Sequence, residues 1–554
     1  MTGGHPRRGG RSAFLVAAGI LASRVAGLVR ERVFAHYLGN SPAAAAFKAA
    51  LRIPNALQNL LGEGVLSASF IPVYAGLLGR QARLEADRVA SAVFAVLTLA
   101  VAVLVALGLL LAPVLVDVVT PGFRGETRVL VIQLVRILFP GTGCLVLSAW
   151  CLGVLNSHRR FLLAYVAPVV WNLAIIAALV GWGGRAEPSR LVVQVAYGAV
   201  LGSALQCLVQ APVVRALLIE FRPRLTLADR QVRRVFRNLG PVVLGRGVVQ
   251  VSAYVDLAYA SLISERAVAA LSYAQALYLL PVSLFGMAVS AAELPELARV
   301  GSPEAGGADE LRARMRAGLE RIAFFVVPSA AALAVLGDVV AGAVLQTGRF
   351  TAADTRYVWL LLAGAAVGLA AGTMARLYSS AFYARHDTRT PLWAAAIRVG
   401  TGAVLAYGVA LWLPPRLGVS RDVGAAGLTL ATGLTAWLEL VLLRRRLGAA
   451  IGPVAVARAL LARLWASAAV AAAVGVAVKL VLLRLLGAAA PIAAGAGPAL
   501  WDQPAWPPIL TALVVLVPYG LAFVTTARAL GVPLARSLVA GAVRRLGPAA
   551  ARRR

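Results

Sequence analysis

The sequence predicts an all-α polytopic membrane protein of about fourteen transmembrane helices, in two six-helix lobes related by a pseudo-twofold repeat, plus two C-terminal helices. Of its 554 residues, 60% are hydrophobic and only 14% are charged. Apolar tracts long enough to cross about 30 Å of hydrocarbon recur along the whole chain. Segments of the first half also return in the second half at a nearly constant offset.

The hydropathy criterion predicts one span in each long apolar tract. The first eleven residues are basic but too short for a targeting peptide, so we expect the first tract to be retained as a span. The expected spans lie near residues 13–37, 43–76, 89–116, 129–155, 161–183, 191–218, 238–263, 267–297, 320–345, 356–383, 391–413, 423–442, 460–487 and 507–527.

Three pairs of similar segments indicate an internal repeat with an offset close to 225 residues. They are residues 67–75 with 290–298, 120–124 with 347–351, and 156–161 with 385–391. The members of each pair lie six spans apart and therefore have the same orientation, as in transporters that bind substrate between two parallel halves. We expect an N-terminal lobe at 1–220, a C-terminal lobe at 221–447, and two extra helices with a basic tail at 448–554.

The formal net charge of +31 is explained by membrane topology rather than by a nucleic-acid partner. With the N-terminus inside, the inside connections carry about three times as many arginines as the outside connections, as the positive-inside rule requires. We therefore expect a multi-pass protein with both termini in the cytoplasm and no nucleic-acid partner.

The second expected span has a polar face. Lys48, Arg52, Asn55, Asn59 and Glu63 are spaced by four, three, four and four residues, which places them on one side of a helix. A charge at the centre of a bilayer costs about 2.5–3.5 kcal/mol on insertion scales, so this face requires a wet cavity or an ionic ligand. The excess charge is positive, which predicts an anionic ligand.

Two isolated acids lie inside later spans, Asp256 in the seventh and Glu439 in the twelfth. An intramembrane acid indicates a proton or cation site by default, so both are candidates for ion coupling. Two alternatives stay open: each acid pairs with a neighbouring arginine, or Glu439 lies at the interface near Arg444.

The sequence does not favour an enzyme. Its four histidines form no metal-ligand pair, there is no phosphate-binding loop, and its three cysteines all fall inside spans. We expect neither a metal site nor a cofactor, and a coupling ion, if one is used, would be Na⁺ or H⁺, or the membrane potential would drive transport.

Several ordered motifs resemble the MurJ (MviN) lipid II flippases of the MOP exporter superfamily. The resemblance extends from about residue 15 to 445, and fourteen spans fit it as well. The motifs are SRVAGLVRE at 23–31, Arg52-Ile-Pro-Asn55, GEGVLS at 62–67 with FIP at 70–72, Thr120-Pro-Gly-Phe123, Leu155-Asn156, Ala167-Pro168 with Asn172, GRFT at 348–351, and FYARHDTRTP at 382–391.

The resemblance implies a bacterial cytoplasmic-membrane protein that moves undecaprenyl-pyrophosphate-linked peptidoglycan precursor to the outer leaflet by alternating access. Its partners would be that lipid, membrane lipids and other cell-wall synthesis proteins. A pyrophosphate calls for point cations and forked donors, so Arg24, Arg30, Arg52 and Lys48 are the first candidates. Arg30 lies nearer the outer end of its span, where snorkelling to the interface is an equally good interpretation.

The chain departs from the family pattern at several charged positions. Ala45 and Ala46 stand where an acid is usual, Gln58 replaces an arginine, and Gln275 with Ala276 replaces an Asp-Arg pair. Arg246 and Arg376, both inside spans, are candidates to supply the missing positive charge. Alternatives therefore stay open: a flippase for another polyprenyl-linked glycan, or a non-transporting cell-wall scaffold. A cation antiporter of the same superfamily would need an acid-rich cavity instead.

Overall fold

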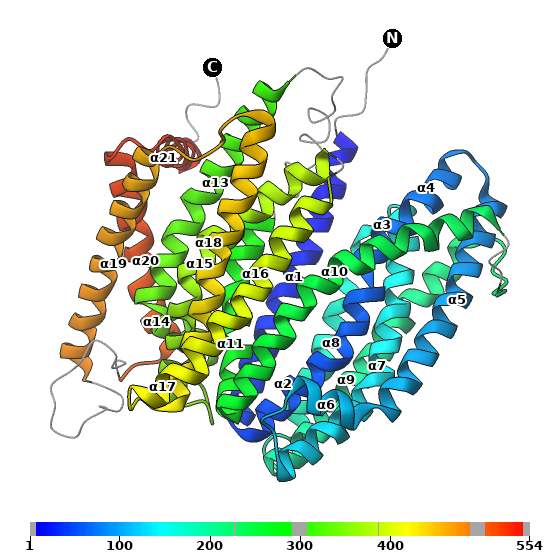
Figure 1. Ribbon diagram of the computed structural model, residues 1–554, viewed down its shortest axis with the longest axis horizontal. Coiled ribbons are helices and arrows are strands. Elements are labelled where there is room, and N and C mark those ends of the chain that lie inside the picture. The colour runs from blue at the N-terminus through cyan, green and yellow to red at the C-terminus, as the bar shows by residue number, and fades with distance from the viewer. Residues whose placement is uncertain are drawn as a thin grey trace. The chain divides into compact units, whose positions relative to one another are not determined.

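The structure is a computed structural model that describes residues 7–225, 229–287, 289–290, 307–385, 387–487 and 505–546. Every regular element in these ranges is helical (Figure 1). Twelve of the described helices are long and apolar enough to cross a membrane. The predicted class, an all-α multi-pass membrane protein, is therefore confirmed, while the exact number of fourteen spans stays a prediction.

The first and seventh expected spans account for the difference between the fourteen expected spans and these twelve helices. They correspond to α1 (Arg7–Leu38) and α10 (Arg230–Ile263), which contain 32 and 34 residues. Both are longer than the about 20 residues that a bilayer requires, but they are not among the twelve.

The chain folds into two compact units. The first consists of Met1–Ala269 with Thr347–Phe350. After α1 it contains the following helices: α2 (Pro42–Leu61), α3 (Glu63–Ser69), α4 (Ile71–Gly79), α5 (Arg83–Leu110), α6 (Ala112–Val119), α7 (Gly125–Ser157), α8 (Phe161–Trp182), α9 (Pro188–Leu217), α10 and the start of α11 (Glu265–Pro281).

The second expected span is broken into α2, α3 and α4. The first break is at Gly62, where an added Cβ would lie 2.2 Å from the carbonyl oxygen of Gln58. The second is next to Pro72, which occupies the first turn of α4 and lacks an N–H for a continuous helix. Pro54, the expected kink, lies inside α2, which continues past it to Leu61.

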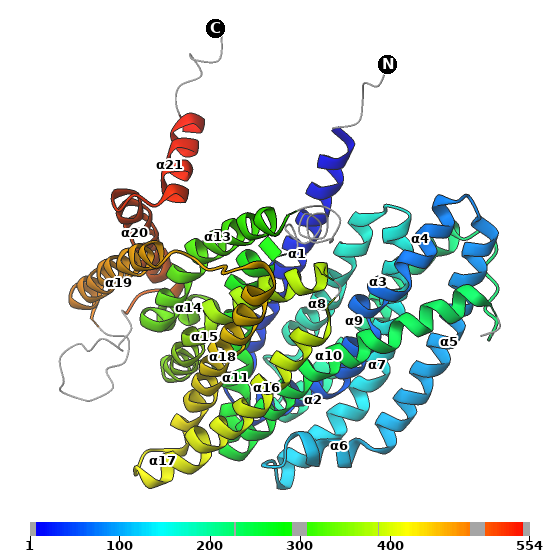
Figure 2. The same cartoon turned by 45° about the horizontal axis from the view of Figure 1, so that its top comes forward.

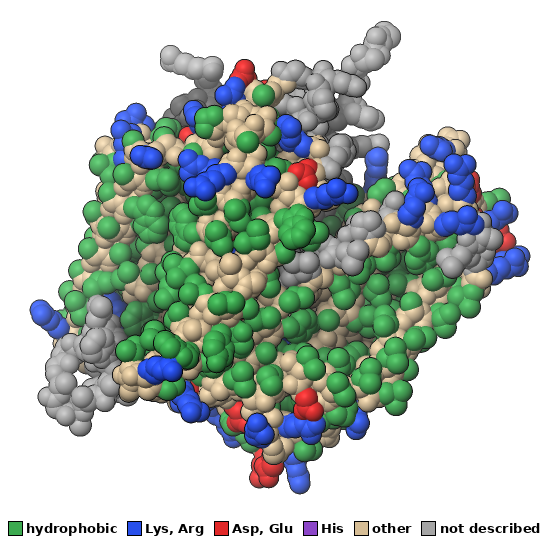
Figure 3. Space-filling view, viewed as in Figure 1, with side chains coloured by type: hydrophobic (Ala, Val, Ile, Leu, Met, Phe, Trp, Pro, Cys, Tyr) green, Lys and Arg blue, Asp and Glu red, His purple; other side chains and the backbone are tan. Residues whose placement is uncertain are grey.

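The second unit consists of Ala270–Gln346 and Thr351–Arg554. It contains the rest of α11 and the following elements: a π-helical turn (Val282–Met287), α13 (Ala308–Val335), α14 (Gly337–Leu345), α15 (Ala352–Ala384), α16 (Arg389–Ala406), a second π-helical turn (Tyr407–Trp412), α17 (Leu413–Arg416), a 3₁₀ turn (Arg421–Val423), α18 (Gly424–Ile451), α19 (Arg458–Leu486), α20 (Pro508–Ala529) and α21 (Pro533–Leu546). In both units hydrophobic side chains cover the middle of the helices, and Lys and Arg gather near the helix ends (Figure 3).

The predicted repeat is visible in the order and length of the helices. In the first unit α5, α6 and α7 have 28, 8 and 33 residues. In the second unit α13, α14 and α15 have 28, 9 and 33 residues. The matched segments 120–124 and 347–351 join the second helix to the third in each set. Of the remaining segments, 291–298 lie outside the described residues.

These two connecting loops dock on helix ends inside the first unit. The N–H of Gly122 donates to Ser261 Oγ of α10 over 3.1 Å, and the N–H of Arg349 donates to the carbonyl oxygen of His36 in α1 over 2.9 Å. A Cβ at Gly122 would lie 1.9 Å from the Ser261 carbonyl oxygen, so only glycine allows this approach.

The predicted lobe boundary at 220 and 221 is not decided by this packing. The helix α10, which would open the second lobe, packs on α2 and α3 of the first unit (Figures 1 and 2). The lobes 1–220 and 221–447 and the segment 448–554 stay predictions.

Candidate functional site

A carboxylate on α1 holds two cations, and we call Arg30, Glu31 and Lys48 the Glu31 cluster. Glu31 is 5% exposed. It accepts a hydrogen bond from Arg30 Nη2 at 2.7 Å and another from Lys48 Nζ of α2. The turn at 39–41 brings the two helices together, and Ser41 caps α2 by accepting from the N–H of Ala44 over 3.2 Å. The cluster contains two positive groups and one negative group.

Aromatic rings lie against both cations of the cluster. The Arg30 guanidinium lies 5.0 Å from the ring centre of Trp171 on α8, and Lys48 Nζ lies 4.4 Å from that of Phe34. The Trp171 indole N–H donates to the Ala199 carbonyl oxygen of α9 over 3.1 Å, which fixes the ring. Cation–π contacts of this kind stabilise positive charge where water is scarce. The structure thus brings together Arg30 and Lys48, but both already have a counter-charge.

Arg52 lies one turn beyond Lys48 and is half-buried. Its carbonyl oxygen accepts a hydrogen bond from the Tyr254 hydroxyl of α10 over 3.0 Å. Asp256, on the same part of α10, interacts electrostatically with the Arg52 guanidinium. Arg52, a predicted substrate-binding cation, and Asp256, a predicted coupling acid, are therefore neighbours. This arrangement agrees with the alternative that Asp256 pairs with an arginine.

The remaining predicted residues of the first unit lie in different surroundings. Arg24 is exposed and makes no hydrogen bond or ion pair with another residue that the structure describes. Asn55 lines a small cavity with residues of α7, α8 and α9, among them Trp171, and Asn59 is exposed. The side chains of Glu63 and Arg246 lie outside the described part of the structure.

In the second unit the predicted acid Glu439 on α18 is 8% exposed and forms an ion pair with Arg398 of α16. The distance from Arg398 Nη1 to Glu439 Oε2 is 2.9 Å. Arg376 on α15 interacts electrostatically with both groups. This arrangement resembles the Glu31 cluster, with two cations and one acid, and it agrees with the alternative that Glu439 pairs with an arginine. Sequence reasoning missed Arg398, although an arginine inside an apolar tract is a visible signal.

A second missed feature is an ion pair between Asp338 of α14 and Lys479 of α19. Lys479 Nζ lies 2.5 Å from Asp338 Oδ2, and the two side chains are 2% and 0% exposed. Lys479 lies in the middle of an otherwise apolar tract, which was the available signal. Close by, the Tyr519 hydroxyl of α20 donates to the Pro328 carbonyl oxygen of α13 over 2.6 Å. These contacts attach α19 and α20 to α13 and α14.

The loop that contains Asp387 forms a turn around this carboxylate. Asp387 accepts hydrogen bonds from the N–H groups of Arg389 and Thr390 and from the Thr390 hydroxyl, over 2.9, 3.0 and 2.6 Å. Partial burial raises the pKa of this carboxyl, but the hydrogen bonds outweigh it and keep the pKa below its usual range. Among the described residues no group of three His, Cys, Asp or Glu side chains could hold a metal ion.

Comparison with protein families gives one match, to the model described as lipid II flippase MurJ, over residues 34–490. Similar curated proteins include a probable lipid II flippase MurJ of Rhizobium meliloti, 31% identical over 77% of this chain and 78% of that protein. The lipid II flippase MurJ of Burkholderia cenocepacia is 30% identical over 78% of this chain and 82% of that protein.

Similar solved structures show the same fold. A structure described as lipid II flippase MurJ in an inward closed conformation has a TM-score of 0.73 and 20% identity, and covers 93% of this chain and 99% of that one. A multidrug resistance MATE transporter of the MOP superfamily, in an inward-facing conformation, has a TM-score of 0.59 and 17% identity over 79% and 98% of the two chains.

Proposed function

The chain belongs to the lipid II flippase MurJ family, which consists of transporters rather than enzymes, and from this premise we propose that it carries lipid II across the bacterial cytoplasmic membrane. The cargo would be undecaprenyl-pyrophosphate-linked peptidoglycan precursor, moved from the inner to the outer leaflet. The observation that carries the proposal is the excess of positive charge on α1 and α2, within apolar tracts, where an anionic headgroup is the natural ligand.

The pyrophosphate binds in a cationic cavity that opens alternately to either side of the membrane. Arg24, which has no partner among the described residues, makes the first contact, and Arg52 makes the second. Arg30 and Lys48 act from the Glu31 cluster, where the acid holds them in place while leaving one positive charge in excess. Arg246 adds a cation from α10.

Polar groups farther along the same face recognise the rest of the headgroup. Asn55 and Asn59 lie on α2 one and two turns beyond Arg52 and offer amide donors and acceptors for sugar or peptide groups. Glu63, the first residue of α3, follows them in the sequence and adds a carboxylate to this set.

Energy coupling uses Na⁺, H⁺ or the membrane potential, through Asp256 and Glu439. Support comes from the position of Asp256 beside Arg52. Binding of a proton or Na⁺ at Asp256 removes its attraction for the guanidinium and releases Arg52 to the pyrophosphate. Glu439 has the same relation to Arg398.

In this proposal both termini face the cytoplasm, as the distribution of arginine in the connections favours. Membrane lipids surround the helices, and other cell-wall synthesis proteins supply and consume the precursor.

The test is complementation in bacteria depleted of their own lipid II flippase, scored by survival and by exposure of the precursor outside the membrane. We expect the parent chain to rescue growth, and Arg24→Gln and Arg52→Gln to fail at equal membrane levels. Arg185→Gln is the matched control, because Arg185 is exposed in the connection between α8 and α9.

A well-inserted parent that does not restore growth would overturn the assignment of lipid II as cargo. Two alternatives then remain, a flippase for another polyprenyl-linked glycan and a non-transporting scaffold. Supplying other polyprenyl-linked glycans to vesicles that contain the protein distinguishes them, because only a flippase would transport one of these lipids. Rescue by Arg24→Gln and Arg52→Gln at the parental level would remove the cationic cavity from the proposal.

A further inference from the structure

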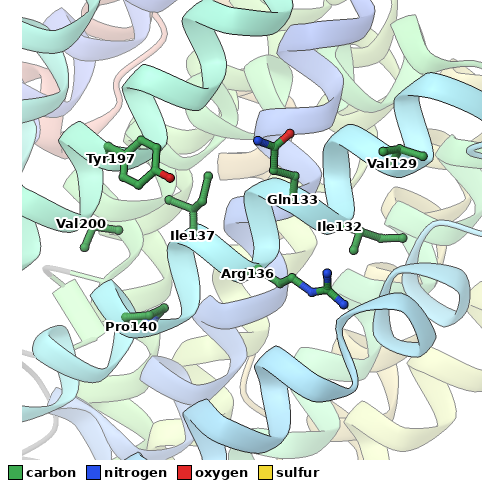
Figure 4. A pocket seen from close by; sticks show the side chains of 8 residues that line it. All are labelled: Val129, Ile132, Gln133, Arg136, Ile137, Pro140, Tyr197 and Val200. Carbon is green, nitrogen blue, oxygen red and sulfur yellow. The ribbon is translucent and has the colours of Figure 1, made fainter.

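A pocket of about 690 Å³ opens between α7 and α9 in the first unit (Figure 4). Its walls are mainly apolar, with Val129, Ile132 and Ile137 among them. Three polar side chains also line it: Gln133 and Arg136 from α7 and Tyr197 from α9. A volume of this size accommodates a small amphiphile or part of a lipid, because ligand pockets commonly measure about 300–1,000 Å³.

The pocket lies on the side of α7 that faces away from α2. Leu138 and Thr142 line the small cavity that includes Asn55 of α2, and both are buried. Gln133 and Arg136 are exposed and lie on the opposite side of the helix, given 3.6 residues per turn. The pocket therefore opens away from the polar face of α2, toward the lipid that surrounds a membrane helix.

The polar groups of the pocket have no partner in the described structure. Arg136, Gln133 and Tyr197 make no hydrogen bond or ion pair with any residue that the structure describes, and the lining includes no acid. Arg128, which is also on α7, pairs with Asp117 of α6 over 2.6 Å. An arginine that faces lipid without a partner is costly, so such residues normally contact an anion, water or a headgroup.

The depth of Arg136 suits the phosphate region of a lipid. It is eleven residues beyond Gly125, the first residue of α7, or about 16 Å along the helix. The whole helix of 33 residues is about 50 Å long and exceeds the hydrocarbon thickness of about 30 Å by about 20 Å. If this excess is shared between its two ends, Arg136 lies a few ångströms inside the hydrocarbon. The long arginine side chain can extend from this depth to the interface.

We propose that the α7–α9 pocket binds an anionic glycerophospholipid. Its phosphate contacts the Arg136 guanidinium, the Gln133 amide and the Tyr197 hydroxyl donate to phosphate or ester oxygens, and an acyl chain lies along Val129, Ile132 and Ile137. The ligand belongs to the leaflet at the N-terminal end of α7. Charge complementarity selects the occupant, because the pocket offers one cation and no acid. Its polar side chains are not among those proposed to bind lipid II, although Val200 lines both this pocket and the small cavity that includes Asn55.

The test measures lipid binding by the purified full-length protein with native mass spectrometry. The probes are dioleoyl-phosphatidylglycerol, dioleoyl-phosphatidylcholine and inorganic phosphate. We expect the parent to bind at least one molecule of phosphatidylglycerol more tightly than phosphatidylcholine. Arg136→Gln should lower the affinity for that phosphatidylglycerol about tenfold, as expected for the loss of a charge-assisted hydrogen bond. Arg136→Lys should restore part of the affinity.

Arg190→Gln is the matched control, since Arg190 is an exposed arginine of α9 outside the pocket. Thermal unfolding without added lipid verifies that Arg136→Gln is folded, and added phosphatidylglycerol should raise the melting temperature of the parent more than that of the variant.

The proposal is overturned if Arg136→Gln binds phosphatidylglycerol as tightly as the parent does, or if the parent binds phosphatidylcholine as tightly as phosphatidylglycerol. It is also overturned if Arg190→Gln weakens phosphatidylglycerol binding to the same degree as Arg136→Gln. If millimolar inorganic phosphate displaces the lipid, the pocket is a simple anion site and not a lipid site. Because the readout is binding, failure here does not depend on whether the chain rescues growth.

Discussion

Lysine occurs at only two positions in this chain, Lys48 and Lys479, and the two regions differ in charge balance and burial. Lys48 shares Glu31 with Arg30, and the three side chains retain 10%, 7% and 19% exposure. Lys479 forms an ion pair with Asp338, and neither side chain is more than 2% exposed. The first region carries one more positive than negative charge and is partly exposed, whereas the charges of the Asp338–Lys479 pair balance and are buried.

The difference distinguishes the region that we propose binds a ligand from a region that stabilises the fold. In a buried pair of one cation and one acid the two charges balance, and each compensates for the burial of the other. A cluster with an excess cation can attract an anion while its acid keeps the cations in position. The Arg398–Glu439 pair with Arg376 resembles the first region, because it has an excess cation and an Arg398 side chain that is 31% exposed.

The largest effect on stability is expected where the closed pair is broken. Asp338→Asn or Lys479→Met leaves one buried charge without a partner and should lower the free energy of unfolding by about 3–5 kcal/mol. The double variant should recover most of the loss. Chemical unfolding in detergent measures all three, and Glu310→Gln, which breaks the exposed pair with Arg314, is the control. A double variant as unstable as either single one would contradict the assignment.

The next effect is expected at the Glu31 cluster. Glu31→Gln leaves Arg30 and Lys48 without their acid and should cost about 1.5–3 kcal/mol of unfolding free energy, less than at Asp338 because ring contacts and partial exposure remain. The same variant should lose complementation, since the cations are no longer held in place. A variant that is destabilised but still rescues growth would show that the cluster is structural, like the Lys479 pair.

A smaller stability effect is expected for Glu439→Gln. Arg398 is partly exposed, so losing the acid should cost less than about 1 kcal/mol. If Glu439 is a coupling site, the dependence of transport on the Na⁺ gradient or on the proton gradient should change, while Glu310→Gln leaves it unchanged. An unaltered dependence on both gradients would remove Glu439 from ion coupling.

The smallest stability effect is expected for Arg24→Gln, because Arg24 is exposed and makes no ion pair with a described residue. The unfolding transition should coincide with that of the parent, whereas precursor export should fall about tenfold or more if Arg24 contacts the pyrophosphate. Unfolding in detergent and export in the depleted strain measure the two quantities separately. A parallel loss of both would show that Arg24 supports the fold instead.

Much of the fold could be predicted because its signals are local. Hydrophobic tracts of about 20 residues identify membrane helices one at a time, and the offset of about 225 residues pairs the α6–α7 loop with the α14–α15 loop. The breaks within one tract could not be predicted in this way. Residues 43–76 form one continuous hydrophobic tract, yet the helix is interrupted at Gly62 and before Pro72.

The sequence by itself determined the class of this protein, its repeat, and the polar face of α2 from Lys48 to Asn59, because helical periodicity acts over a few residues. Only the tertiary structure decided which charges meet. Glu31 reaches Lys48 across a turn, Asp256 reaches Arg52 from α10, and Asp338 reaches Lys479 over 141 positions. Such pairs depend on how helices pack, and in an apolar medium each charge must find its partner wherever the packing places one.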